Sequence, residues 1–223
     1  QVAVMLRIAL YVCPQTICSS LSMAQDAFSL ANRLAGAPRF QLQRFSLDGQ
    51  PVHLEFAQIL VDGGLELAEQ ADLLIVPATG SAITRTLEGN AKLLPWLAQR
   101  DQQQVASLCS SAFLLAAAGL LDGRQATTHW ALADAFARYF PQVNLRSDLL
   151  LTEDGPLFCS GGAQAGLDLC LHLIALHAGE WLAQQVASAM VIERQRGTQT
   201  RIAPLLPSSE DTSLAPLLTW LRQ

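Results

Sequence analysis

The chain has 223 residues, of which 51% are hydrophobic, so it is long enough for one large α/β domain with a substantial core. Its formal net charge of −5 argues against a surface that grips nucleic acid by itself, because such surfaces are usually basic. We therefore do not expect these residues alone to form a nucleic-acid-binding surface.

The first half of the chain predicts strands that alternate with helices. Residues 2–12 are β-rich and almost continuously apolar, as in a buried strand, but they are too short to span a bilayer and do not form a signal peptide. A helix is expected over 19–34, with Ser19, Ser20 or Ser22 as its cap. The next elements are a strand at 40–47, a short return strand at 52–56, an apolar strand at 72–76 and a helix at 93–100.

The second half continues the alternation. Its expected elements are a strand at 104–108, a helix at 112–120, a short β-like segment at 126–130, a helix at 131–139, a hairpin of 149–152 with 157–160, a buried helix after Gly161-Gly162, and a helix at 180–192. This order predicts a mostly parallel sheet covered on both faces. Sites in such sheets form at the carboxyl ends of strands, where both the loop 77–81 and Cys109 are expected to lie.

The end of the chain differs in composition. We expect a first domain over residues 1–196, followed by a linker rich in Thr, Pro and Ser over 197–213. Residues 214–223 predict the truncated start of a second domain, because they begin an amphipathic helix of only about two turns.

Cysteine content indicates a reducing compartment. The five cysteines are Cys13, Cys18, Cys109, Cys159 and Cys170. Their odd number and irregular spacing argue against a disulfide framework, and no CxxC pair or Cys/His cluster suggests a metal. We expect a cytoplasmic protein with no membrane contact, no metal and no cofactor.

Cys109 stands between an apolar strand and a helix of small residues, so it is expected at the apex of a tight turn. There the helix dipole favours a thiolate, and the following backbone N–H groups can hold a carbonyl oxygen or an anion. His129, twenty residues later, is the candidate base. A thiol and a histidine in this arrangement form the framework of a cysteine hydrolase. The alternative interpretation of Cys109 is a structural one, in which it is a small buried residue that fits the turn.

Residues 106–130 closely resemble the core motif of GlxA-type AraC-family transcriptional regulators, which carry a PfpI/ThiJ-like (class I glutamine-amidotransferase-like) domain before a helix-turn-helix domain. Further matches are 75–77, 160–169 and 214–222, the last similar to the first DNA-binding-domain helix. The resemblance implies a flavodoxin-like three-layer α/β sandwich with a mostly parallel sheet. It also implies a homodimer that binds DNA through a C-terminal helix-turn-helix domain largely outside this chain.

The resemblance places the family's elbow cysteine at Cys109, its neighbouring histidine at His129, and oxyanion-type N–H groups at Gly80 and Ser110. Catalytic members generally carry an acidic residue after the first strand. Here that position holds Ser20, and a serine does not act as a general acid or base near neutral pH.

We therefore expect a non-catalytic domain that senses a small molecule such as a nitrogenous metabolite, with Cys109 and His129 as vestigial catalytic residues. The expected ligand-binding residues are Cys109, Ser110, His129, Trp130, Ser20, Thr79 and Gly80. Trp130 would give an aromatic wall for a cationic group, and Thr79 replaces a glycine that is common in the family.

Two alternatives remain at this point. One is an enzyme of the PfpI/ThiJ type, a hydrolase, hydratase or deglycase with Cys109 as nucleophile. The other is a redox sensor, because an accessible thiol of low pKa oxidises readily.

Overall fold

The computed structural model describes residues 4–194. The linker expected at 197–213 and the helix start expected at 214–223 lie outside the described residues. None of the helices within 4–194 combines the length and the apolar character that crossing a membrane requires.

A six-stranded sheet forms the centre of the fold, in the order β2-β1-β5-β6-β10-β9. Its strands are β1 (Leu6–Tyr11), β2 (Phe40–Phe45), β5 (Leu73–Val76), β6 (Gln104–Leu108), β9 (Leu151–Asp154) and β10 (Leu157–Ser160). All neighbours are parallel except β9, which pairs antiparallel with β10 as the second half of a hairpin. The predicted mostly parallel sheet is thus confirmed.

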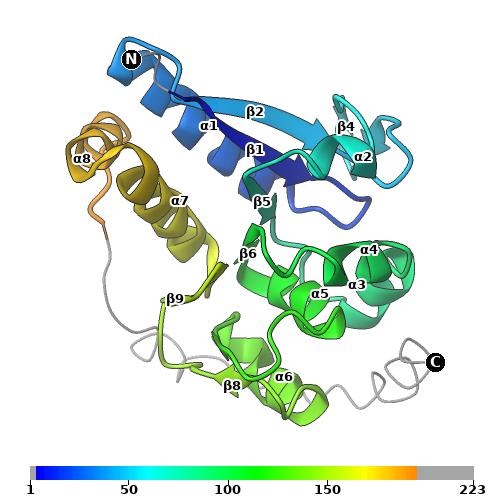
Figure 1. Cartoon of the computed structure of the whole chain (residues 1–223). Helices are drawn as coiled ribbons and strands as arrows, with labels where there is room; N and C mark the ends of the chain where they lie inside the picture. The colour runs from blue at the N-terminus through cyan, green and yellow to red at the C-terminus, as the bar shows by residue number, and fades with distance from the viewer. Residues whose placement is uncertain (1–3, 195–223) are drawn as a thin grey trace.

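Helices cover both faces of the sheet, so the fold has three layers (Figure 1). One face packs against α1 (Cys18–Ala35), α7 (Ala163–Ala178) and α8 (Glu180–Ala189). The other packs against α2 (Leu65–Ala68), α3 (Ile83–Gly89), α4 (Leu93–Ala98) and α5 (Ala112–Ala117).

The alternation of side chains along each strand explains the two cores. In β1, Ile8 and Leu10 lie in the cluster with α1 and α7, whereas Ala9 and Tyr11 lie in the opposite cluster. Successive residues of a strand point to opposite faces, so a strand buried on both sides is apolar throughout. This is why the sequence of β1 shows no polar alternation over its buried residues 8–11.

The first helix begins earlier than expected and without a side-chain cap. Its N-cap is Ile17, so the prediction that Ser19, Ser20 or Ser22 caps α1 is wrong; all three lie inside the helix. The helix ends at Gly36, whose φ of 69° is left-handed and suits a glycine C-cap.

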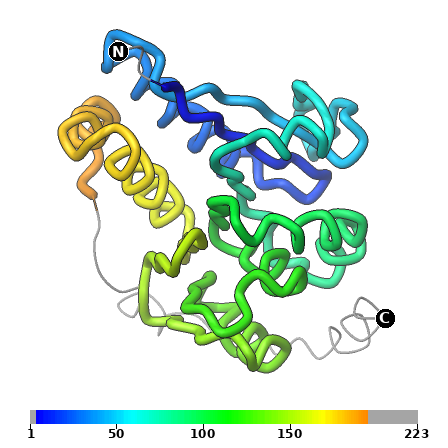
Figure 2. Tube along the Cα trace, in the orientation of Figure 1, coloured from blue at the N-terminus to red at the C-terminus, as the bar shows by residue number. Residues whose placement is uncertain are grey.

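Small elements complete the fold. They are β3 (Val52–His53) paired with β4 (Gln58–Ile59), β7 (Gln125–Ala126) paired with β8 (Asn144–Leu145), and α6 (Ala133–Tyr139). The segment with α6 and β8, light green in Figure 2, lies at one end of the molecule. The strand expected at 126–130 is shorter than predicted, because the chain turns into a 3₁₀ helix at Trp130–Leu132.

Candidate functional site

Cys109 occupies a strained turn at the carboxyl end of β6. Its φ is 59°, in the left-handed region that residues other than glycine rarely adopt. A 3₁₀ turn over Cys109–Ser111 leads from this position directly into α5. Strain of this kind persists only where surrounding contacts hold it, and it is concentrated at functional sites. The predicted turn with a thiol at its apex is therefore present.

Hydrogen bonds hold the turn from three sides. The buried Ser111 hydroxyl accepts the N–H of Leu108 at 3.0 Å and lies 2.7 Å from the carbonyl oxygen of Val76, to which it donates. The N–H of Cys109 donates to the Ser160 hydroxyl at 3.4 Å, and the Cys109 carbonyl accepts from the Thr128 hydroxyl at 3.1 Å. The turn is thereby fixed to β5, to β10 and to the segment before His129.

The Cys109 thiol is protonated at neutral pH. Burial raises its pKa above the ordinary value of 9.0, and hydrogen bonds from the N–H and hydroxyl of Ser110 only partly offset this. The expected thiolate is therefore not favoured here, because burial disfavours the charged form more than the Ser110 hydrogen bonds favour it.

His129 is arranged as a hydrogen-bond donor toward the cavity rather than as a base. Its Nδ1 accepts the N–H of Ala131 at 3.1 Å, which places the proton of the neutral ring on Nε2. Burial lowers its pKa, so the ring stays neutral near pH 7. Within residues 4–194 no hydrogen bond joins His129 to Cys109. Neither ring nitrogen is thus available to take the thiol proton.

Ser20 and Ser110 both hold the loop that follows β5. The Ser20 hydroxyl accepts the N–H of Ala78 at 2.9 Å, and the Ser110 hydroxyl accepts the N–H of Thr79 at 3.1 Å. Ser20 therefore bonds another segment's backbone instead of capping its own helix. It contributes a hydroxyl, and no charge, to this part of the site.

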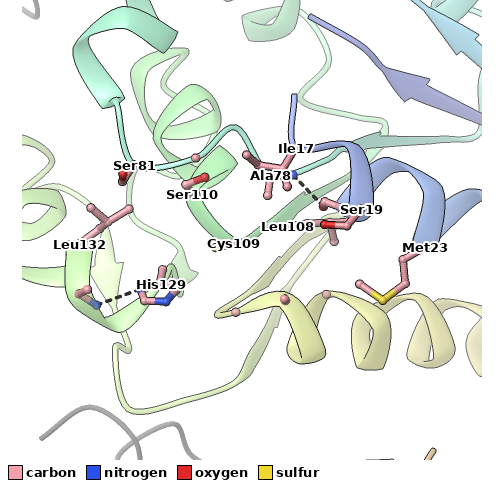
Figure 3. A pocket seen from close by; sticks show the side chains of 16 residues that line it. Ile17, Ser19, Met23, Ala78, Ser81, Leu108, Cys109, Ser110, His129 and Leu132 are labelled. Atoms are coloured by element: carbon pink, nitrogen blue, oxygen red, sulfur yellow. Dashed lines mark hydrogen bonds between the residues drawn. The ribbon is translucent and has the colours of Figure 1, made fainter. Parts of the chain in front are cut away.

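These elements enclose a cavity of about 690 Å³, within the range typical of small-molecule sites. In Figure 3, His129 and Leu132 lie on one side of it and Ser19 and Met23 on the other. Its polar wall residues are Ser19, Ser20, Ser81, Cys109, Ser110 and His129. The remaining ten wall residues are apolar or glycine, and no Asp, Glu, Lys or Arg of residues 4–194 lines the cavity.

Five of the seven expected ligand-binding residues line this cavity: Ser20, Gly80, Cys109, Ser110 and His129. Trp130 does not, although its ring lies 5.5 Å from that of His129. Thr79 does not line the cavity either. Its side chain is buried, and its hydroxyl has no hydrogen-bond partner within the described part of the chain. The aromatic wall expected for a cationic ligand is therefore missing.

The apolar residues that line the cavity were not predicted from the sequence. Ile17 and Met23 come from the start of α1, Leu132 from the turn after His129, and Gly166 from the start of α7. A signal for the two helices existed, because both begin where parallel strands end. No pattern in the sequence marks Leu132 as a wall residue.

Comparison with known proteins agrees with this geometry. Residues 26–176 match the DJ-1/PfpI family. The HTH-type transcriptional regulator CdhR of Pseudomonas aeruginosa is 36% identical over 179 residues, 79% of this chain and 52% of CdhR. The HTH-type transcriptional regulator GlxA of Rhizobium meliloti is 32% identical over 173 residues, 75% of this chain and 52% of GlxA. The chain spans about half the length of these relatives.

An enzyme is also similar over a shorter stretch. Isonitrile hydratase of Pseudomonas putida is 34% identical over 116 residues, 52% of this chain and 49% of the enzyme. Among solved structures, an AraC family transcriptional regulator from Pseudomonas putida has a TM-score of 0.67 at 21% identity, covering 83% of this chain and 99% of that one. At this identity the structural likeness shows the fold alone.

Proposed function

Because the chain belongs to the DJ-1/PfpI family, we propose that residues 4–194 form the regulatory domain of a transcriptional regulator, which binds a small molecule and performs no chemistry on it. The observation that supports this most is a cavity in which Cys109 and His129 are not arranged as a nucleophile and its base. Burial raises the pKa of the thiol, and His129 Nδ1 already accepts the N–H of Ala131. By the family resemblance, Ser20 stands where catalytic members carry an acidic residue, and its hydroxyl bonds to Ala78. Covalent catalysis by a thiol needs a thiolate and an oriented base.

The similarity to regulators such as CdhR and GlxA supports the rest of the proposal. The protein forms a homodimer in the cytoplasm, and a helix-turn-helix domain outside the described residues contacts DNA. The effector changes DNA binding only if its affinity differs between two arrangements of the dimer.

A thermal-shift screen of amino acids, amides, betaines, polyamines and small acids tests the proposal. A ligand at about 100 times its Kd stabilises by about 2.7 kcal/mol, which is easily measured. Gly162→Trp should abolish the shift, because Gly162 lines the cavity, has an extended backbone and leaves space for a larger side chain. Gln164→Trp, on the same helix but outside the cavity wall, is the matched control. If no compound gives a shift that Gly162→Trp removes, the proposal is wrong.

An enzyme is the second candidate, favoured by the left-handed Cys109 and by the similarity to isonitrile hydratase. The test is turnover of isonitrile, amide and glyoxal substrates by the wild-type chain and by Cys109→Ser. We expect no turnover that depends on Cys109. Turnover lost in Cys109→Ser would establish the enzyme instead.

A further inference from the structure

Three polar groups of the cavity wall, at His129, Ser20 and Gly80, can donate a hydrogen bond to a ligand. His129 presents Nε2–H, because its Nδ1 already accepts from Ala131. The Ser20 oxygen accepts from Ala78, so its own proton is available to a ligand. The N–H of Gly80 has no partner within residues 4–194.

Three backbone carbonyls of the cavity wall already accept hydrogen bonds. The carbonyl of Ala78 accepts from Ile17, that of Cys109 from Thr128, and that of Gly162 from Gly166. Helices α1 and α7 also begin at the cavity wall, and neither N-terminus has a side-chain cap. The positive ends of these two helix dipoles favour a negatively charged group in the cavity, in addition to the three hydrogen-bond donors.

The wall formed by the described residues does not compensate a positive charge. It contains no Asp or Glu, and no aromatic ring other than the imidazole of His129. Removing a cation from water without a partner is costly. A ligand that fills this space must therefore present acceptors to these donors and apolar groups to Ile17, Met23 and Leu132.

From this donor set we infer that the effector is a small monocarboxylate with an apolar, uncharged remainder. Its carboxylate lies among His129 Nε2–H, the Gly80 N–H and the Ser20 hydroxyl. The inference rests on the proposed ligand-binding function and names the chemical class of the ligand. It differs from the expectation of a nitrogenous metabolite, and Trp130, which would have given a cationic group an aromatic wall, is not among the lining residues.

Three probes of equal chain length test the inference by calorimetric titration of the full chain at pH 7.5: hexanoate, hexanamide and hexyltrimethylammonium. Hexanoate should bind at least tenfold more tightly than either of the others. The protein variants are Ser20→Asp and Ser20→Asn. Both replacements retain an oxygen that can accept the Ala78 N–H, but only the first adds a negative charge beside the bound carboxylate.

Ser20→Asp should weaken hexanoate binding at least tenfold more than Ser20→Asn does, because both variants lose the hydroxyl and only Asp adds a negative charge beside the carboxylate. His129→Phe, which keeps a ring and removes the donor, should also weaken it by about tenfold. This second position keeps the inference testable if Ser20→Asp does not fold. The inference is overturned if hexanoate binds no better than the other two probes, or if neither charge at position 20 nor loss of the donor at 129 alters its affinity.

The two proposals fail in different ways. A cationic or neutral compound from the screen whose binding Gly162→Trp removes would overturn the carboxylate class and leave the regulatory function standing. Absence of any compound that binds in this cavity would overturn both.

Discussion

Ser111→Ala should destabilise the protein more than any other single serine-to-alanine change at the turn. The Ser111 side chain is fully buried, and it joins the N–H of Leu108 to the carbonyl oxygen of Val76. The alanine leaves both backbone groups without this partner. Each buried polar group that loses its hydrogen bond costs about 1–3 kcal/mol, so we expect a loss of about 2–4 kcal/mol.

Urea unfolding followed by circular dichroism measures this loss. With a slope of about 2 kcal/mol per molar urea, the midpoint should fall by about 1–2 M. The matched control is Ser107→Ala, at a site in the preceding strand that is equally buried. The Ser107 hydroxyl makes no hydrogen bond to nitrogen or oxygen and lies against the weakly accepting Cys159 thiol. Its loss should cost less than about 1 kcal/mol. Equal midpoints for the two variants would refute the argument that Ser111 holds the turn.

Three further predictions follow from the same contacts. Because burial raises its pKa, the Cys109 thiol should react with iodoacetamide more slowly at pH 7.5 than a solvent-exposed cysteine, and its rate should still be rising above pH 9; a rate that levels off below pH 7 would contradict this. Ser20→Ala should lower the free energy of unfolding by about 1–3 kcal/mol, since the buried N–H of Ala78 loses its partner, and Ser19→Ala is the control expected to have little effect. Burial raises the pKa of Cys170 from 9.0 to about 12, so the neutral thiol stabilises the folded state fully below pH 9, and this stabilisation is lost as the pH rises toward 12. Between pH 8 and pH 11 the free energy of unfolding should therefore fall by about 2.7 kcal/mol more in wild type than in Cys170→Ala. Equal decreases in the two proteins would contradict this prediction.

Strands and long helices were predictable because their signals are local. β6 has the predicted bounds, since an apolar run ends at a cysteine followed by small helix-forming residues. The hairpin of β9 and β10 is marked by the intervening turn. Helix α3 was missed because its short sequence, with two threonines and a terminal glycine, shows no clear apolar period.

The composition of the site was largely predictable, and its chemistry was not. The resemblance brought Ser20, Gly80, Cys109, Ser110 and His129 to one cavity, as the structure shows. The proton position on His129 depends on a backbone N–H two residues later, which only the 3₁₀ turn places there. The contact of Ser20 with Ala78 spans 58 residues and leaves no sequence pattern.

The state of Cys109 illustrates the same limit. The sequence shows the helix that would favour a thiolate, and it does not show how deeply the sulfur is buried. The depth of burial is a property of the packed structure, and it raises the pKa of the thiol.

The most direct test of non-catalytic binding is a calorimetric titration of wild type and Cys109→Ala with a compound whose binding Gly162→Trp removes, followed by mass spectrometry of the recovered compound. We predict Kd values within about threefold of each other and a compound recovered unchanged from both proteins. A compound consumed by wild type and left intact by Cys109→Ala would contradict the account and show that this cavity is an active site.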